Sequence, residues 1–272
     1  DVSVQVAAGV FHQAPSLLAL SVEEGGQPVN LGLRQQRNVQ LAGGLSWVAN
    51  PGLRITAEGF YKDYDRVPLL RDDSRVALSN LGGDYGFVGA EPLTDDGTGR
   101  ARGVELFVQQ KLLGSVYFLG AYTLSWSEFA GGDGVLRPSA WDRRHAMDLT
   151  SGFRPSQSWE FGAKLRWLSG LATTPWDLAA SKVSYALTGR GIPDWDRVGQ
   201  IRTPAYLRLD LRAERRVSYA GWNAVFYLDL QNVLNRKNAV GFAYTESPEY
   251  SNRIRPIDGA GLLPTFGFSI EF

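Results

Sequence analysis

Residues 262–272 read LLPTFGFSIEF. From Pro264 onward every second residue is apolar, and the residues between are small or polar. Successive side chains of a strand point to opposite faces, so this period of two predicts a strand with one apolar and one polar face. The apolar row is Pro264, Phe266, Phe268, Ile270 and Phe272, and the polar row is Thr265, Gly267, Ser269 and Glu271.

The same alternation recurs along the whole chain, and it defines ten segments. They are residues 2–11, 38–48, 53–69, 99–111, 115–129, 143–154, 158–170, 204–217, 222–235 and 262–272. The connections between them alternate strictly between two kinds. The short turns are 49–52, 112–114, 155–157 and 218–221, and the long loops are 12–37, 70–98, 130–142, 171–203 and 236–261. Alternate connections of an up-and-down sheet lie at opposite ends, so we expect the short turns at one end and the long loops at the other.

The long loops are rich in Gly, Pro, Asp and Ser, so no helix is predicted anywhere. The sequence also shows no low-complexity tract, linker or domain boundary, so residues 1–272 are predicted to form a single domain.

Composition excludes several classes of protein. Lys plus Arg equals Asp plus Glu at 28 each, so no net charge attracts nucleic acid, which is not expected as a partner. The absence of cysteine excludes disulfides and thiolate metal sites. No run of about 18 apolar residues exists, which argues against a transmembrane helix but not against a β-barrel, whose strands are only half apolar.

The polar faces indicate contact with water. In residues 206–216, Leu207, Leu209 and Leu211 share one face, while the other carries Arg208, Asp210, Arg212 and Glu214. Four consecutive charges on one face are too many for a dry core. The charged face must line either bulk water or a wet lumen. The charged residues expected on this face, and expected to pair across strands, are Glu58, Glu105, Asp148, Lys164, Arg166, Arg208, Asp210, Arg212, Glu214, Asp229 and Glu271.

Tryptophans on the apolar faces form two rows. Trp47, Trp159 and Trp222 lie beside short turns, whereas Trp126 and Trp167 lie toward the long loops. Indole rings favour the headgroup level of a bilayer, and the eight residues from Trp159 to Trp167 span roughly 20 Å along the membrane normal in a tilted strand. The two rows favour a lipid-facing aromatic girdle over a soluble β-sandwich. The predicted fold class is therefore all-β, a transmembrane antiparallel up-and-down β-barrel with about ten strands here.

The start of the chain predicts a larger whole. The single methionine is Met147, and no charged and apolar leader precedes the first strand. We therefore expect a processed chain or a piece of a longer one.

Several stretches resemble the C-terminal half of a TonB-dependent outer-membrane receptor over roughly residues 38–272. They are GRARGVELFVQQK (99–111), SVYFLGAYTLSWSEF (115–129), WDRRHAMDLTSGFR (141–154), WEFGAKLRWLSG (159–170), YLRLDLRAERR (206–216), WNAVFYLDLQNVLNRKN (222–238) and LPTFGFSIEF (263–272). The resemblance implies a bacterial outer membrane location and the last ten strands of a barrel of about 22 strands with a plugged lumen. It implies energised uptake of a scarce ligand such as a siderophore, haem, cobalamin or a saccharide.

The resemblance also implies partners. Nothing here is similar to the family's plug or TonB-binding segment. The plug and the remaining barrel strands are therefore expected in the same polypeptide or in another chain. The remaining strands are needed because an unpaired strand edge is not tolerated in lipid. Outer-membrane lipid, TonB acting through the plug, and the barrel-insertion machinery are the other expected partners. The terminal Phe272 resembles the signal read by that machinery.

Two alternatives remain open from the sequence. One is a receptor-like barrel that serves as a structural subunit of a larger outer-membrane complex, and the other is a self-closed ten-strand porin or protease-type barrel. The enzyme version would use Asp142 and His145, but no nucleophile elbow is present and an enzyme is not expected. With no cysteine and only His12 and His145, neither a metal site nor a cofactor is expected.

Ligand contacts are expected from aromatic and basic residues of the long loops and the rim. The candidates are Trp141, Arg143, Trp176, Tyr185, Arg190, Trp195 and Arg197.

Overall fold

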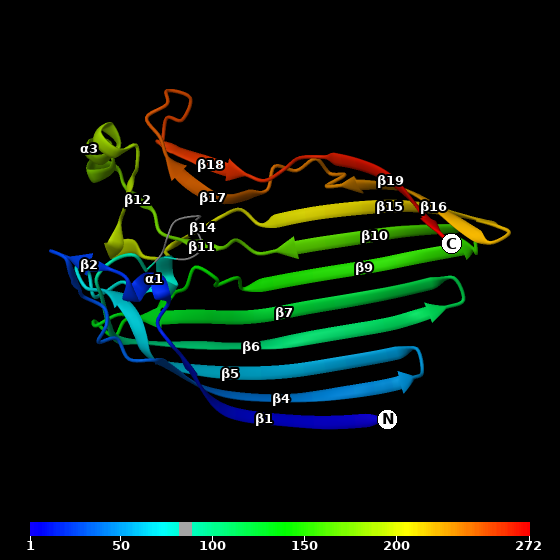
Figure 1. The fold of residues 1–272 in the computed structure, drawn as a ribbon, viewed down its shortest axis with the longest axis horizontal. Helices are drawn as coiled ribbons and strands as arrows, with labels where there is room; N and C mark the ends of the chain where they lie inside the picture. Colours follow the sequence, from blue (N-terminus) through cyan, green and yellow to red (C-terminus); the bar gives the residue numbers. More distant parts are fainter. Residues whose placement is uncertain (82–88) are drawn as a thin grey trace.

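The computed structural model describes residues 1–81 and 89–272, and its main element is an antiparallel sheet in which ten long strands follow one another in chain order (Figure 1). Each strand pairs with the next, as the alternation predicted. The long strands are β1 (Val2–Gln13), β4 (Gln36–Asn50), β5 (Leu53–Leu70), β6 (Leu93–Leu113), β7 (Val116–Ala130), β9 (His145–Ser156), β10 (Trp159–Leu168), β15 (Tyr206–Tyr219), β16 (Trp222–Gln231) and β19 (Leu263–Glu271).

Short turns lie at one end of the sheet and long loops at the other, which confirms the expected asymmetry (Figure 1). The turn between β4 and β5 shows the local cause: Asn50 Oδ1 accepts hydrogen bonds from the backbone N–H groups of Gly52 (2.9 Å) and Leu53 (3.0 Å). The loops contain short elements of their own. These are α1 (Leu17–Leu20), β2 (Glu23–Glu24), β3 (Gln27–Pro28), α2 (Leu78–Leu81), β8 (Arg137–Pro138), β11 (Ala172–Thr173), β12 (Trp176–Asp177), α3 (Leu178–Thr188), β13 (Ile192–Pro193), η1 (Trp195–Arg197), β14 (Ile201–Arg202), β17 (Ala239–Tyr244) and β18 (Ile254–Asp258).

The prediction that no helix occurs is wrong. The loops 12–37 and 70–98 contain the four-residue helices α1 and α2, and the loop 171–203 contains the 11-residue helix α3. Asp177 caps its N-terminus by accepting hydrogen bonds from Ala179 N and Ala180 N, both at 3.0 Å. Gly189 ends it with φ of 69°, a left-handed conformation that glycine adopts without steric cost. The loop 236–261, which was also predicted to be irregular, contains the hairpin of β17 and β18. Part of the predicted loop 70–98, residues 82–88, lies outside the described residues.

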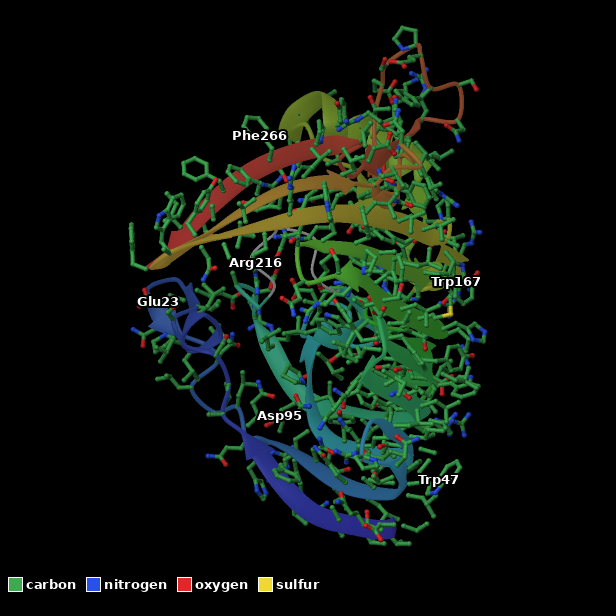
Figure 2. The ribbon with its side chains drawn as sticks, turned by 90° about the vertical axis from the view of Figure 1, so that its right-hand side faces the viewer. Glu23, Trp47, Asp95, Trp167, Arg216 and Phe266 are labelled. Carbon is green, nitrogen blue, oxygen red and sulfur yellow. The ribbon has the colours of Figure 1, made fainter. Side chains whose placement is uncertain are left out.

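The sheet is strongly curved, and its two faces differ in chemistry (Figure 2). Trp47, Trp167 and Phe266 project outward from the convex side, while Asp95 and Arg216 lie on the concave side. The convex face leaves large apolar side chains exposed, among them Val6 at 75% and Phe266 at 88%. A soluble protein rarely exposes so large a continuous apolar surface, so the convex face is suited to lipid.

The concave face carries the charges that the alternation assigned to it. Arg166 Nε contacts Asp148 Oδ1 of the neighbouring strand at 2.7 Å, and Arg212 Nη1 contacts Asp229 Oδ2 at 2.8 Å. The expected pairing across strands is thus confirmed for these two pairs. Glu58 and Glu105 depart from it, because the register of β5 and β6 places these like charges directly opposite each other. The Glu271 side chain lies outside the described part of the structure.

All five predicted girdle tryptophans lie on the convex face by register. Trp47 pairs with Val2 and Ile55, and Trp167 pairs with Met147 and Leu207. Their contact with lipid remains a prediction.

The small buried core lies at the long-loop end of the sheet. It consists of Val67, Leu69, Ala77 and Phe129, with Tyr64 packed against it. Gly99 makes room for this packing, since a Cβ at that position would lie 2.2 Å from the Phe129 ring. The core gives the loops a fixed base above the sheet. In the described residues no helix is both long enough and apolar enough to cross a membrane.

Candidate functional site

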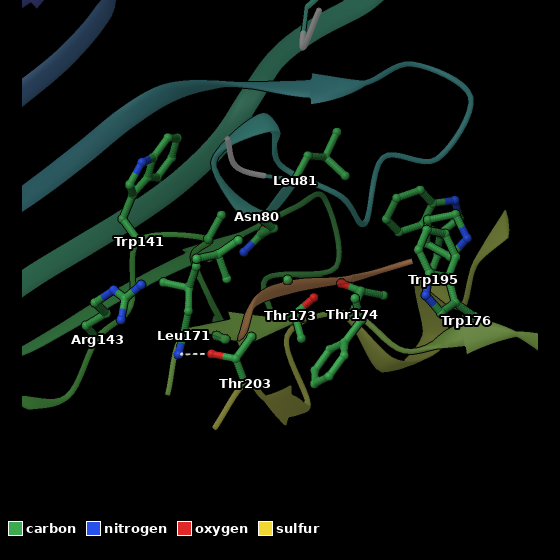
Figure 3. A pocket seen from close by; sticks show the side chains of 16 residues that line it. Asn80, Leu81, Trp141, Arg143, Leu171, Thr173, Thr174, Trp176, Trp195 and Thr203 are labelled. Carbon is green, nitrogen blue, oxygen red and sulfur yellow. Dashed lines mark hydrogen bonds between the residues drawn. The ribbon is translucent and has the colours of Figure 1, made fainter. Parts of the chain in front are cut away.

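A pocket of about 400 Å³ lies among the long loops, and four of the seven predicted ligand residues line it (Figure 3). Its walls come from α2, the segment before β9, the strands β11 to β13, the short helix η1 and β17. The four predicted residues that line it are Trp141, Arg143, Trp176 and Trp195. Figure 3 shows Trp176 and Trp195 close together on one side, with Trp141 and Arg143 on the other.

Three predicted residues are outside this pocket. Tyr185 lies on α3, where its ring meets that of Tyr244 with 5.4 Å between the centroids. Arg190 is an exposed residue that follows the end of α3, and Arg197 Nε donates to Gln200 Oε1 at 3.5 Å. The structure therefore does not bring these three together with the other four, and the ligand role of all seven remains a prediction.

Arg143 supplies the pocket with positive charge. Its guanidinium donates from Nη1 to the carbonyl oxygen of Ser169 at 3.2 Å, and partial burial lowers the pKa of Arg143. An arginine stays protonated at neutral pH even so. Within residues 1–81 and 89–272 no ion pair involves Arg143. A half-buried cation without a carboxylate partner favours an anionic ligand.

Asp142 positions the segment that carries Trp141 and Arg143. Its side chain is fully buried, and Oδ2 accepts a hydrogen bond from Ser127 N at 2.9 Å. Its Oδ1 is ion-paired with Arg202, which also donates to the carbonyl oxygens of Asp142 (2.9 Å) and Gly170 (3.0 Å). One carboxylate thus ties the end of β7 to the segment before β9 and to β14.

His145 has different partners. Its Nδ1 is 2.8 Å from the hydroxyl oxygen of Tyr122, and its ring lies between those of Tyr122 and Trp167 at centroid distances of 6.1 and 5.9 Å. By register His145 faces the convex side, whereas Asp142 is buried beneath the loops. The enzyme alternative required the two side chains to act together, and this geometry gives each a separate structural role.

Several pocket residues were missed from the sequence. Asn80 is buried in α2 and donates from Nδ2 to the carbonyl oxygens of Arg137 (3.2 Å) and Pro138 (3.0 Å). Thr203 Oγ1 accepts a hydrogen bond from Leu171 N at 3.0 Å (Figure 3). Phe242 enters the pocket on β17. No local pattern marks these residues, because each reaches the pocket through contacts with distant segments.

Gly191 allows Trp176 to take its position. A Cβ at residue 191 would lie 2.9 Å from Cε3 of Trp176 and 2.5 Å from Cβ of Tyr244. The absence of a side chain therefore lets the indole pack against the backbone beside the pocket.

These features define a class of protein. A curved up-and-down sheet with an apolar convex face, a charged concave face and long loops around a pocket at one end is the wall of a membrane β-barrel. Residues 1–233 match the family model described as TonB dependent receptor-like, beta-barrel. The chain belongs to this family, as its sequence motifs predicted.

Solved structures share the fold. The closed form of the ferric-catecholate import receptor Fiu from E. coli K12 superposes with a TM-score of 0.66 at 16% identity, over 99% of this chain and 32% of that one. The siderophore receptor PiuA from Acinetobacter baumannii gives a TM-score of 0.63 at 13% identity, over 99% of this chain and 33% of that one. The copper transporter OprC gives 0.63 at 12% identity, over 100% and 37%.

The chain therefore spans about a third of the length of these structures. No curated protein matches its sequence. Members of the family are outer-membrane β-barrel proteins and transporters, and the predicted all-β barrel fold is confirmed.

Proposed function

We propose that this chain forms part of the barrel wall and extracellular vestibule of a receptor for energised uptake of a scarce ligand. In this proposal the long loops face the cell exterior and the short turns the periplasm, as in other outer-membrane barrels. The remaining barrel strands, a plug, TonB acting through that plug and the barrel-insertion machinery are its partners.

The observation that carries the proposal is the setting of Arg143. Its guanidinium lies in a pocket that is also lined by Trp141, Trp176 and Trp195. Guanidinium and indole groups bind planar, delocalised anions through charge-assisted hydrogen bonds and stacking. The pocket is therefore suited to an anionic ligand with aromatic or conjugated groups, and ferric siderophores are the first class to test among siderophores, haem, cobalamin and saccharides.

Proteins whose solved structures share this fold support this order of testing. They include a ferric-catecholate import receptor, a siderophore receptor and a ferripyoverdine receptor bound to ferripyoverdine. Their identities of 12 to 16% establish the fold, so these ligands are a guide to the choice of probes.

The test uses cells that carry the complete protein containing this chain and that lack other iron receptors. Uptake of radiolabelled iron is measured with ferric catecholate and ferric pyoverdine as probes, and labelled cobalamin and haem are measured in parallel. We expect Arg143→Gln to weaken the apparent affinity for the accepted probe about tenfold, because a charge-assisted hydrogen bond is worth about 1.5–3 kcal/mol.

Arg255→Gln is the matched control, because Arg255 is exposed on β18, at the same end of the barrel but outside the pocket. Equal effects of the two variants would contradict the role of the pocket. Uptake of no probe by protein present at normal surface levels would contradict transport and favour the structural-subunit alternative.

A further inference from the structure

Three aromatic rings on the concave face lie over a glycine of the neighbouring strand. In each case the two residues are directly opposite each other in the register, and the ring–glycine pairs are Phe60 with Gly103, Tyr117 with Gly152, and Tyr227 with Gly267. A Cβ at residue 103 would lie 2.7 Å from Cζ of Phe60, and a Cβ at residue 267 would lie 2.5 Å from Cζ of Tyr227. A Cβ at residue 152 would overlap the Tyr117 ring. Each ring therefore occupies the space that a side chain on the opposite residue would need.

A positively charged side chain lies over each of these rings. The distances to the ring centroid are 5.4 Å for Lys62 and Phe60, 5.8 Å for Arg154 and Tyr117, and 4.2 Å for Arg212 and Tyr227. Carboxylates hold two of the cations: Arg154 Nε is 2.6 Å from Glu160 Oε2, and Arg212 Nη1 is 2.8 Å from Asp229 Oδ2. The Tyr117 hydroxyl also donates to Glu160 Oε1 at 2.6 Å. Contacts with the cations thus help to keep the rings in place over the glycines.

The ring–glycine pairs join strands that are connected by long loops. Among the strands that the structure describes, five neighbouring pairs have such a connection, and they are β1 with β4, β5 with β6, β7 with β9, β10 with β15, and β16 with β19 (Figure 1). The second, third and fifth of these contain a ring–glycine pair. A tight turn fixes the register of the strands that it joins, whereas the cost of closing a long loop hardly changes when the loop length changes by two residues. These strand pairs therefore need another source of register.

Each ring fits its neighbouring strand in one register. A slip of one residue would move every side chain to the other face, which the alternation of apolar and polar residues opposes. A slip of two residues keeps the faces, but it would place Tyr117 opposite Thr150 or Arg154, both of which carry a Cβ. In the same way, the other two rings would meet Thr265 or Ser269 and Ala101 or Glu105. The ring–glycine pairs therefore disfavour the slip that alternation by itself permits.

Other contacts act in the remaining strand pairs. Strands β10 and β15, which are also joined by a long loop, place Lys164 directly opposite Asp210, and opposite charges favour this register. Phe129 lies over Gly99 in the short-turn hairpin of β6 and β7, but this ring belongs to the buried core. The ring–glycine pairs with a cation over the ring thus belong to strands that no tight turn aligns.

We propose that the ring–glycine pairs select the register of these long-loop strand pairs while the barrel assembles. The ring of one strand packs against the glycine of the next beneath a cation, and this packing stabilises the observed register over one shifted by two residues. The pair of Tyr227 and Gly267 aligns the last strand, β19, and with it the outward apolar row of that strand. This role in assembly does not depend on which ligand the barrel transports.

The test follows β7 and β9 in cells that produce the complete protein containing this chain. The chain has no cysteine, so a disulfide between two introduced cysteines reports which residues face each other. Phe118→Cys with Ser151→Cys reports the observed register, and Phe118→Cys with Leu149→Cys or with Phe153→Cys reports a register shifted by two residues. Pulse labelling and heat-modifiable migration measure how fast the barrel assembles.

We expect Gly152→Ala to slow assembly about fivefold and to increase the shifted disulfides at the expense of the one in the observed register, because the added Cβ displaces the Tyr117 ring. Tyr117→Ala should also increase the shifted disulfides, since it removes the ring that selects the register, whereas Tyr117→Phe should not. Once Tyr117→Ala has removed the ring, adding Gly152→Ala should have little further effect. Gly162→Ala is the matched control, because Gly162 lies directly opposite Gly152 on the same face and its Cβ would be an ordinary 3.6 Å from Cβ of Arg212.

Equal effects of Gly152→Ala and Gly162→Ala on assembly would overturn the proposal. So would an unchanged ratio of the disulfides in Tyr117→Ala, because that variant removes the ring without adding any steric overlap. If Gly152→Ala yields no assembled barrel, the double variant with Tyr117→Ala decides. Recovery of the barrel when the ring is absent supports the pairing of ring and glycine, and failure to recover overturns it.

Discussion

Replacement of Asp142 by alanine tests whether one buried carboxylate holds the pocket in place. The change removes the acceptor of Ser127 N at 2.9 Å and the ion-pair partner of Arg202, and it leaves both donors without their carboxylate. A hydrogen bond to a buried charged group is worth about 1.5–3 kcal/mol, and breaking a buried ion pair costs about 3–5 kcal/mol. Because the Arg202 side chain is 35% exposed and can be hydrated, we expect a total loss of about 3 kcal/mol.

The loss should appear locally, since Asp142 links loop segments and does not hold the ten-strand sheet together. We expect the Ser127 amide to exchange its hydrogen about 100-fold faster in Asp142→Ala, measured by hydrogen exchange and mass spectrometry on the folded protein. The affinity for the transported probe should fall with it, because Trp141 and Arg143 flank the altered residue. Asp142→Asn keeps an acceptor for Ser127 N and should lose only about 1 kcal/mol.

Asp133→Ala provides the matched control, because Asp133 is also a loop aspartate paired with arginine, at 2.6 Å from Arg137, but it is more exposed. An exposed pair is worth about 1 kcal/mol or less. Similar exchange rates at Ser127 in Asp142→Ala and Asp133→Ala would refute the reasoning. A double-mutant cycle with Arg202→Ala should give a coupling energy of about 1–3 kcal/mol, and a coupling near zero would show that the ion pair does not contribute.

Two further predictions concern the loops and the C-terminus. Hydrogen bonds from Arg75 and Arg137 hold the pKa values of Asp73 and Asp133 below their ordinary range. A lowered carboxyl pKa stabilises the folded loops above the ordinary value near 4 and loses this effect as pH falls through the lowered pKa. The rate of hydrogen exchange in the loops, corrected for its intrinsic pH dependence, should therefore stay constant from pH 7 to about 4 and rise below pH 4. If that rise persists in the double variant Asp73→Asn with Asp133→Asn, the assignment to these two carboxylates is wrong. Deletion of Phe272, which is 99% exposed, should lower the amount of assembled barrel more than it lowers the ligand affinity of the barrel that does assemble. Surface labelling measures the amount of assembled barrel, and Phe272→Trp is the control. Normal surface levels of the deletion variant would count against an assembly signal.

The long strands could be predicted from the sequence because their signals are local. Alternation in a stretch such as 206–216 assigns each side chain to a face, and the short turns fix the register of adjacent strands. The structure agrees with all ten predicted strands to within a few residues at most ends. Helix α3 was missed although Asp177 and Gly189 carry ordinary capping signals, because the abundance of Gly, Pro, Asp and Ser in that loop favoured irregular structure.

The sequence by itself determined the strands, their order and the chemistry of the two faces, because each depends on neighbours in the chain or on a short turn. Only the tertiary structure decided which loop residues meet. Arg202 reaches Asp142 from 60 residues away, and Trp176 and Trp195 approach Arg143 because the curved sheet gathers its loops at one end. Tyr185, Arg190 and Arg197 have the same residue chemistry but lie outside the pocket. The sequence could not separate them from the four pocket residues, because composition records no distance between segments that are far apart in the chain.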